Sequence, residues 1–241
     1  MNWLEILKQN LRFKIWAKYK ANIYPSFYYS HSQFGEDMVV RHLTDGKTQG
    51  FYVDIGAFHP VYLSNTYHFY CKGWQGINID GRPKSMELFQ VLRPKDINLE
   101  ICLSSEEKDV TFFSFEQSPY DTINPSVAEE VINEKKIKLL NKFSMKSRTL
   151  ESVLEEYLPD GKKIDLMNID VEGIDEEILM SNNWQKFKPR IIIFEKHNVS
   201  FREASDSSIV TFLEKIGYRF VTKVGFSLIM INQDDSTVLK T

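Results

Sequence analysis

The chain has 241 residues, of which 42% are hydrophobic and 13% aromatic. That content is enough for the core of one large α/β domain and excludes general disorder. With 30 basic and 33 acidic residues the net charge is −3, so the chain has no overall positive field that would hold nucleic acid.

The first twenty residues differ from the rest of the chain. Apolar residues recur there at near-helical spacing, and the basic residues outweigh the single acid Glu5. The sequence therefore predicts a basic amphipathic helical extension over 1–30. Two interpretations stay open: peripheral contact of 1–20 with an anionic membrane surface, or packing on the domain or on another subunit of a homo-oligomer.

Targeting features are few. There is no run of 18 apolar residues and no secretory cleavage pattern, and Cys71 and Cys102 form no CxxC pair. We expect two reduced, mostly buried thiols in a cytoplasmic protein. If the extension binds lipid, the protein would lie at the inner face of the membrane.

Residues 31–241 are predicted to form one α/β domain. The predicted strands cover 51–57, 76–80, 97–103, 110–115, 163–171, 190–196, 218–224 and 226–231. The predicted helices cover 31–43, 64–73, a segment from about 83, 149–158 and 203–216. An insertion is predicted at about 117–147, with a turn followed by a polar helix.

The last two predicted strands are separated by Gly225 alone, so they must form an antiparallel hairpin. A parallel βα series closed by one hairpin resembles the Rossmann-like class I methyltransferase fold. That resemblance implies a mainly parallel seven-stranded sheet with helices on both faces.

The ends of the first two strands point to a nucleotide-like ligand. Strand 51–57 contains Asp54 and Gly56, and strand 76–80 ends in Asp80. Ligands of open α/β sheets bind at the carboxyl ends of the strands, where a carboxylate can accept hydrogen bonds from ribose hydroxyls. Gly56 is expected to let the backbone approach the ligand without a Cβ in between.

Two pairs with i,i+2 spacing follow later strands: Asp170 with Glu172, and Glu195 with His197. The four groups would converge near the cofactor if the strand 163–171 lies between the strands 51–57 and 190–196. Three interpretations are open: general-base catalysis, a divalent metal held by Asp170, Glu195 and His197, or helix capping with a structural imidazole.

Further residues are candidates for the same edge of the sheet. His59 lies in the turn after Gly56, where it either lines the site or serves the turn made by Pro60. Gln33, Glu36 and Asp37 either reach the site and bind substrate, or cap and charge the first turn of a helix.

Several blocks resemble the FkbM-type S-adenosylmethionine-dependent methyltransferases over about 32–197. They are Ser32–Asp37, Val53–Ala57, Ser64–Thr66, Gly73–Asp80, Arg93-Pro94, Arg148–Leu150 and Ile169–Gly173. The resemblance implies O-methyl transfer, often to a sugar hydroxyl of a glycan or of a glycosylated metabolite. The acceptor would then be a small molecule or a glycan, as in polysaccharide biosynthesis.

The resemblance also implies roles for residues. Asp54, Gly56 and Ala57 would meet the methionine part of S-adenosylmethionine, Asp80 the ribose, and Ser104 would lie near the adenine. Asp170 or His197 would act as the base, with Glu172 and Glu195 orienting it or binding the acceptor. The chain departs from the usual glycine-rich loop at 58–60, which leaves the path of that loop open.

Three other functions were weighed. A nicotinamide-dependent oxidoreductase would need GxGxxG after the first strand, which is absent. A nucleic-acid methyltransferase acting on base amino groups would carry an Asn/Asp-Pro-Pro-aromatic run where this chain has Asp170–Gly173, and the acidic balance also disfavours it. A non-catalytic glycan-binding relative is disfavoured by the intact set of carboxylates.

Overall fold

A computed structural model of the chain describes residues 29–234. The predicted basic extension falls in residues that lie, apart from Tyr29 and Ser30, outside the described part. None of the helices in 29–234 combines the length and the apolar character needed to cross a bilayer.

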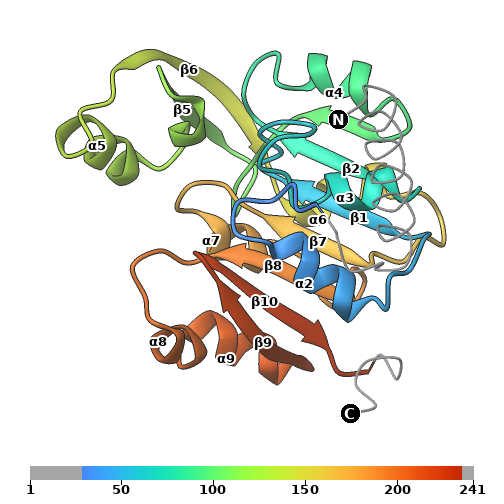
Figure 1. The fold of residues 1–241 in the computed structure, drawn as a ribbon. Coiled ribbons are helices and arrows are strands. Elements are labelled where there is room, and N and C mark those ends of the chain that lie inside the picture. Colours follow the sequence, from blue (N-terminus) through green and yellow to red (C-terminus); the bar gives the residue numbers. More distant parts are fainter. Residues whose placement is uncertain (1–28, 235–241) are drawn as a thin grey trace, which may run out of the picture. The chain divides into compact units, whose positions relative to one another are not determined.

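The chain alternates between strands and helices, and Figure 1 labels most of these elements. In chain order they are α2 (Glu36–Leu43), β1 (Phe51–Ile55), α3 (Tyr67–Cys71), β2 (Gln75–Asp80), α4 (Met86–Leu92), β3 (Ile97–Glu100), β4 (Cys102–Leu103), β5 (Asp109–Phe115), the 3₁₀ turn η1 (Ser118–Tyr120), α5 (Pro125–Asn133), β6 (Leu139–Arg148), α6 (Leu150–Tyr157), β7 (Leu166–Ile169), α7 (Asp175–Met180), β8 (Ile191–Glu195), α8 (Phe201–Ser205), α9 (Ser208–Lys215), β9 (Tyr218–Val224) and β10 (Ser227–Asn232).

The main sheet has seven strands in the order β3-β2-β1-β7-β8-β10-β9. The pairs from β3 to β8 are parallel, whereas β10 runs antiparallel to both β8 and β9. The predicted fold class and hairpin are therefore confirmed. The strand order reverses between β1 and β7, which is where ligands of open α/β sheets bind.

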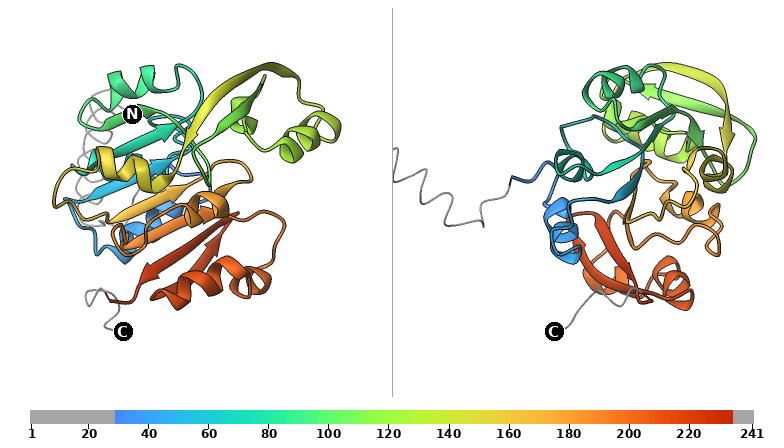
Figure 2. Two further views of the ribbon diagram at one scale, coloured as in Figure 1. Left: turned by 180° about the vertical axis from the view of Figure 1, so that it is seen from behind. Right: turned by 90° about the vertical axis from the view of Figure 1, so that its right-hand side faces the viewer.

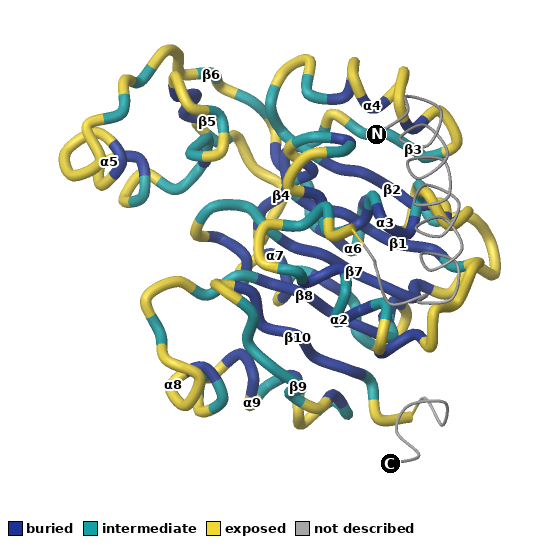
Figure 3. Tube along the Cα trace, in the orientation of Figure 1, coloured by how far each residue is buried: buried dark blue, intermediate teal, exposed yellow. Residues whose placement is uncertain are grey.

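Both faces of the sheet are covered because successive side chains of a buried strand point to opposite sides. In β8, Ile191 and Ile193 pack in a cluster with residues of α2 and α3, while Ile192 and Phe194 pack with residues of α6, α7 and α9. The left view of Figure 2 shows α6 and α7 in front of the sheet. Figure 3 shows the central strands buried along their length.

The structure corrects the prediction for 97–103 and for the insertion. The former divides into β3, which joins the main sheet, and β4, which pairs with β6 in a separate three-stranded sheet. The predicted insertion at 117–147 contains most of β6, a strand that the prediction lacked and that pairs antiparallel with β5. Together β5, η1, α5 and β6 form an arm that projects beyond the main sheet in Figure 1.

Three smaller predictions also change. The helix expected over 203–216 is two helices, because Ser207 takes an extended conformation as the N-cap residue of α9. The short helix α7 was not predicted. Both cysteines are free thiols, but Cys71 is exposed rather than buried.

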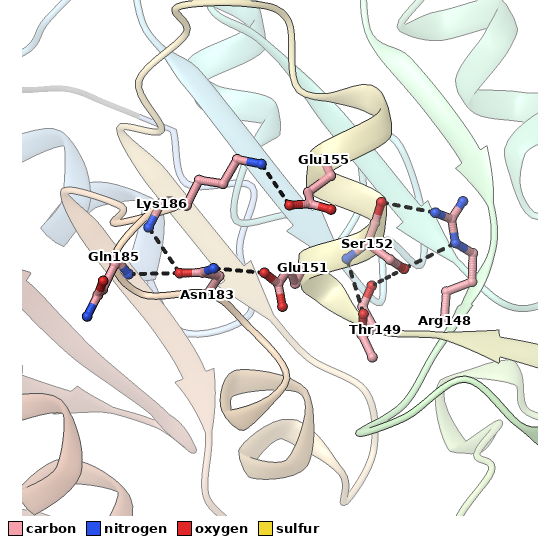
Figure 4. A network of polar contacts seen from close by, with 8 residues as sticks. All are labelled: Arg148, Thr149, Glu151, Ser152, Glu155, Asn183, Gln185 and Lys186. Carbon is pink, nitrogen blue, oxygen red and sulfur yellow. Dashed lines mark hydrogen bonds and ion pairs between the residues drawn. The ribbon is translucent and has the colours of Figure 1, made fainter.

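Polar contacts fix α6 at its N-terminal end (Figure 4). The Thr149 hydroxyl accepts a hydrogen bond from the Ser152 N–H at 3.1 Å, an N-cap of the usual kind. Arg148 donates to Ser152, and Asn183, in the loop after α7, donates to Glu151 at 2.8 Å. The block Arg148–Leu150 thus has a structural role in joining β6 to the body of the sheet.

Candidate active site

A cavity of about 700 Å³ opens at the carboxyl edge of the sheet. Because β7 lies between β1 and β8, the residues that follow these strands face one another across it. The predicted site residues that line the cavity are Gln33, Glu36, Gly56, Asp80, Asp170, Glu172, Glu195 and His197. The four groups after β7 and β8 were expected to converge if β7 lies between β1 and β8, and the strand order meets this condition.

Other predicted site residues lie outside the wall of this cavity. They are Asp37, Asp54, Ala57, His59 and Ser104. Asp37 is buried and accepts hydrogen bonds from the His31 N–H at 2.7 Å and the Ser32 hydroxyl at 2.8 Å. These two contacts tie the segment before α2 to the start of that helix.

His59 serves the turn in which it lies. Its Nδ1 accepts hydrogen bonds from the N–H groups of Val61 at 3.1 Å and Tyr62 at 2.9 Å. Burial lowers the pKa of this imidazole, and the nearby Arg93 lowers it further. Ser104 is buried beyond β4, where its N–H donates to the Arg148 carbonyl at 2.9 Å.

Asp54 lies beneath the cavity in a buried polar network. Its carboxylate accepts hydrogen bonds from the Thr66 hydroxyl at 2.5 Å and the Asn168 amide at 2.8 Å. Asn65 donates in turn to Asn168 at 2.8 Å. Burial raises the pKa of Asp54, an effect that the charge of Arg93 opposes. Hydrogen bonds therefore connect the motif Asp54-Ile-Gly56 with the motif Ser64-Asn-Thr66.

Arg93, the residue that follows α4, completes this network and is fully buried. Its guanidinium donates to the Pro60 carbonyl at 2.7 Å, the Ser64 hydroxyl at 2.7 Å and the Thr66 hydroxyl at 2.8 Å. Thr66 therefore accepts a hydrogen bond from Arg93 and donates one to Asp54. Through this hydroxyl the buried guanidinium is linked to the buried carboxylate. The arrangement fixes the loop after β1.

Gly56 is required by a close contact within the chain, whatever its part in binding a ligand. Its φ is +77°, and a Cβ at this position would lie 1.7 Å from the Asp170 carbonyl oxygen. The close approach is between β1 and the end of β7, so the glycine serves packing of the chain as well as any ligand. It also brings the backbone of β1 against the first residue of the acidic cluster.

Three carboxyl groups line the floor of the cavity, those of Asp170, Glu172 and Glu195, and the buried Asp175 interacts with Glu195 and Glu172. Burial, and then the negative charge of Glu195, raise the pKa of Glu172 to about 7 and that of Asp175 to about 7. The same two causes raise the pKa of Asp170 well above its usual range. Charges of one sign held close together in a buried site retain protons near neutral pH.

His197 is the exception in this cluster. Its Nε2 lies 2.7 Å from the Glu195 carboxylate, and the hydrogen bond between them raises the pKa of the imidazole. The ring packs 4.6 Å from that of Phe226, centroid to centroid. The side chain remains 43% exposed, so a molecule in the cavity can reach it.

The arm holds the turn that carries Glu172. Glu172 has a φ of +49° and Gly173 one of +95°, so the turn adopts a conformation that a non-glycine residue rarely takes. The Thr122 hydroxyl donates to the Glu172 carbonyl at 3.0 Å, and the Asn124 amide donates to the Gly173 carbonyl at 3.2 Å. The arm also contributes residues 118–123 and Lys135 to the cavity wall.

The opposite end of the cavity, at β2 and β4, suits a nucleoside. Burial raises the pKa of Asp80 to about 6, although the Arg82 N–H donates to its carboxylate at 2.7 Å. Apolar walls come from Ile101, Leu103 and Phe112. The Ser85 hydroxyl lines the same end, and its interaction with the Asp80 carboxylate opposes the rise of that pKa.

Sequence reasoning missed several residues of the site. They are Asp175, Arg82, Tyr120, Asp121, Lys135 and Phe226. Asp175 begins α7, and its position two residues after Gly173 was the only available sign of its role. No group of three or more His, Cys, Asp or Glu side chains within residues 29–234 is arranged to hold a metal ion.

Comparisons with known proteins identify the family of the chain. Residues 54–220 match the family described as the methyltransferase FkbM domain. No curated protein matches the sequence. Among solved structures, the chain is similar to the small RNA methyltransferase HEN1, at 14% identity and a TM-score of 0.39, with 90% of this chain and 28% of that chain covered. The chain thus spans less than a third of that protein.

Proposed function

The chain belongs to the FkbM methyltransferase family, and from this premise we propose that it transfers a methyl group from S-adenosylmethionine to a hydroxyl oxygen of a sugar in a glycan or glycosylated metabolite. The observation that carries the proposal is that one cavity holds two kinds of polar group. At one end lies Asp80, a carboxylate placed to accept hydrogen bonds from ribose hydroxyls, and at the other end lies the hydrogen-bonded pair of His197 and Glu195.

The residues at the two ends of the cavity fit the cofactor that the family implies. Asp80 and Ser85 would hold the ribose, and the apolar residues Ile101 and Leu103 would hold the adenine. When bound, S-adenosylmethionine supplies an electrophilic methyl group on a positively charged sulfur. The protein must then position the acceptor oxygen in line with that methyl group and remove the hydroxyl proton.

His197 is the best placed group to accept that proton. Its Nε2 is engaged by Glu195, which leaves Nδ1 for the acceptor hydroxyl when the imidazole is neutral. Asp170 is the second candidate, since burial and the neighbouring carboxylates raise its pKa well above the usual range. Glu195 would orient the imidazole and stabilise it after protonation.

The acceptor would lie at the β8 and β10 end of the cavity. Gln33 offers a polar group there, and Phe226 offers an aromatic face that is 37% exposed. Glu36 is buried, and its carboxylate accepts hydrogen bonds from the Phe34 N–H and the Ser227 hydroxyl. Hydroxyl groups on one side and apolar C–H faces on the other are characteristic of sugars. This combination supports a sugar over an apolar small molecule.

Isothermal titration calorimetry of the purified chain tests the cofactor. We expect S-adenosylhomocysteine to bind at micromolar concentration and NAD to show no heat of binding, because the chain lacks the glycine-rich turn that a pyrophosphate requires. Binding of NAD with no binding of S-adenosylhomocysteine would overturn the proposed function.

A transfer assay tests the base. With methyl-labelled S-adenosylmethionine and an acceptor found in a panel of glycans, we expect His197→Ala to lower turnover by about 10²–10⁴-fold. The affinity for S-adenosylhomocysteine should stay within about twofold. His42→Ala, which removes an exposed imidazole on α2, is the matched control and should leave turnover unchanged. Normal turnover by His197→Ala would exclude this residue as the base.

A further inference from the structure

A second cavity, of about 600 Å³, opens at the amino edge of the main sheet, at the opposite end of β1 from the candidate active site. Its wall is formed by the loops that lead into β1, β2 and β7, and it shares no lining residue with the first cavity. The polar side chains in this wall are those of Lys47, Gln49, Gln75, Lys162, Lys163 and Asp165.

Positive charge predominates in the second cavity. Among the described residues that line it, Asp165 is the only acid, and both of its carboxylate oxygens are occupied. One accepts a hydrogen bond from the Lys47 ammonium at 2.7 Å, and the other accepts one from the Phe51 N–H at 3.0 Å. Within residues 29–234 neither Lys162 nor Lys163 forms an ion pair. Two ammonium groups therefore remain without a counter-charge.

The backbone that carries these lysines is held in place by buried contacts. The Trp74 indole donates to the Lys47 carbonyl at 2.8 Å, and a Cβ on Gly50 would lie 2.6 Å from the Trp74 ring. The loop before β1 thus packs directly on a buried side chain. The Asp165 N–H donates to the Phe51 carbonyl at 2.8 Å, which joins the loop before β7 to the start of β1. A ligand therefore need not order the wall that it contacts.

We propose that this second cavity binds the phosphate group of a phosphomonoester or of a diphosphate. A terminal phosphate carries roughly two negative charges near neutral pH, which matches two ammonium groups that have no acid beside them. Lysine binds phosphate as a point charge, so it needs no fixed angle of approach. The volume lies in the usual range of small-molecule sites, about 300–1,000 Å³, which leaves room for the organic group that the phosphate carries.

Two sources offer such a phosphate, a soluble metabolite and the headgroup of an anionic lipid. Calorimetry of the full chain with pyrophosphate and with inorganic phosphate represents the first source. Sedimentation with phosphatidylcholine vesicles, with and without phosphatidic acid, represents the second. We expect pyrophosphate to bind and its affinity to fall as the salt concentration rises.

A pair of matched double variants tests the site. Lys162→Gln with Lys163→Gln should weaken the binding of pyrophosphate by about tenfold or more, because each charge-assisted hydrogen bond contributes about 1.5–3 kcal/mol. Lys138→Gln with Lys146→Gln removes the same charge from exposed positions of the arm and should leave the affinity within about twofold. All four lysines are exposed, so both variants should melt like the wild type without ligand. The basic residues before Tyr29 are present in every variant, so their attraction for anions cancels.

The outcomes decide both the site and the source. Binding of pyrophosphate that depends on Lys162 and Lys163 without any binding of vesicles identifies a soluble phosphate, whereas vesicle binding that depends on them identifies a lipid. The inference is wrong if the two double variants weaken binding equally, if saturating S-adenosylhomocysteine displaces pyrophosphate, or if the wild type binds neither phosphates nor vesicles. Binding of a single-stranded oligonucleotide in place of pyrophosphate would also overturn it. The inference goes beyond the proposed function, and the failure of one leaves the other standing.

Discussion

Arg93→Met is expected to lower the free energy of unfolding by about 3–5 kcal/mol, as measured by urea denaturation. The substitution keeps an unbranched apolar stem but removes a guanidinium that is fully buried. It leaves the Pro60 carbonyl and the Ser64 hydroxyl without their donor, and it removes the charge that opposes the burial of Asp54. Leaving a buried carboxylate uncompensated is among the most destabilising changes known for single residues.

Two controls define this prediction. Arg82→Met removes an arginine whose side chain is 43% exposed and should cost less than about 1 kcal/mol. The double variant Arg93→Met with Asp54→Asn should recover part of the loss, because no buried carboxylate then remains. A loss below about 1 kcal/mol for Arg93→Met alone would show that the network contributes little to stability.

Gly56→Ala is expected to destabilise the chain by more than about 3 kcal/mol and to abolish binding of S-adenosylhomocysteine. The added Cβ would lie 1.7 Å from the Asp170 carbonyl oxygen, which is backbone and cannot rotate away. The end of β7 must therefore move, and the acidic cluster moves with it. Urea denaturation and calorimetry measure the two effects.

Gly161→Ala separates the clash from the backbone conformation. Gly161 has a φ of +72°, close to that of Gly56, but a Cβ there would meet no atom within 4 Å. Gly161→Ala should lower the free energy of unfolding by only about 1 kcal/mol, the usual cost of a left-handed conformation for a residue with a side chain. Equal losses for the two variants would contradict the role given to the contact with Asp170.

The sequence predicted the edge of the sheet at which the site lies because that information is local. Short apolar runs ending in Asp and Gly mark the ends of parallel strands, and two runs joined by Gly225 alone must form a hairpin. The order of the strands then placed Asp170, Glu172, Glu195 and His197 in one cavity. These steps need only periodicity and loop length.

The roles of single residues depended on contacts that the sequence does not encode locally. Asp54 was expected to meet the cofactor, but Asn168, 114 residues further on, occupies one of its oxygens. Strand β6 alternates apolar and polar residues only partly, because it belongs to an exposed ribbon rather than to the core. Helix α7 has 6 residues, too few for a helical period to be recognised.

The construction of the arm bears on how acceptor preference can change during evolution. The arm has a small core of its own, in which Phe113, Phe115, Ala128 and Val131 pack together. Its links to the turn 170–173 are hydrogen bonds from Thr122 and Asn124 to backbone carbonyls, which exist whatever side chains that turn carries. Substitutions in the arm can therefore reshape one wall of the cavity while the sheet, and the floor built on it, keep their packing.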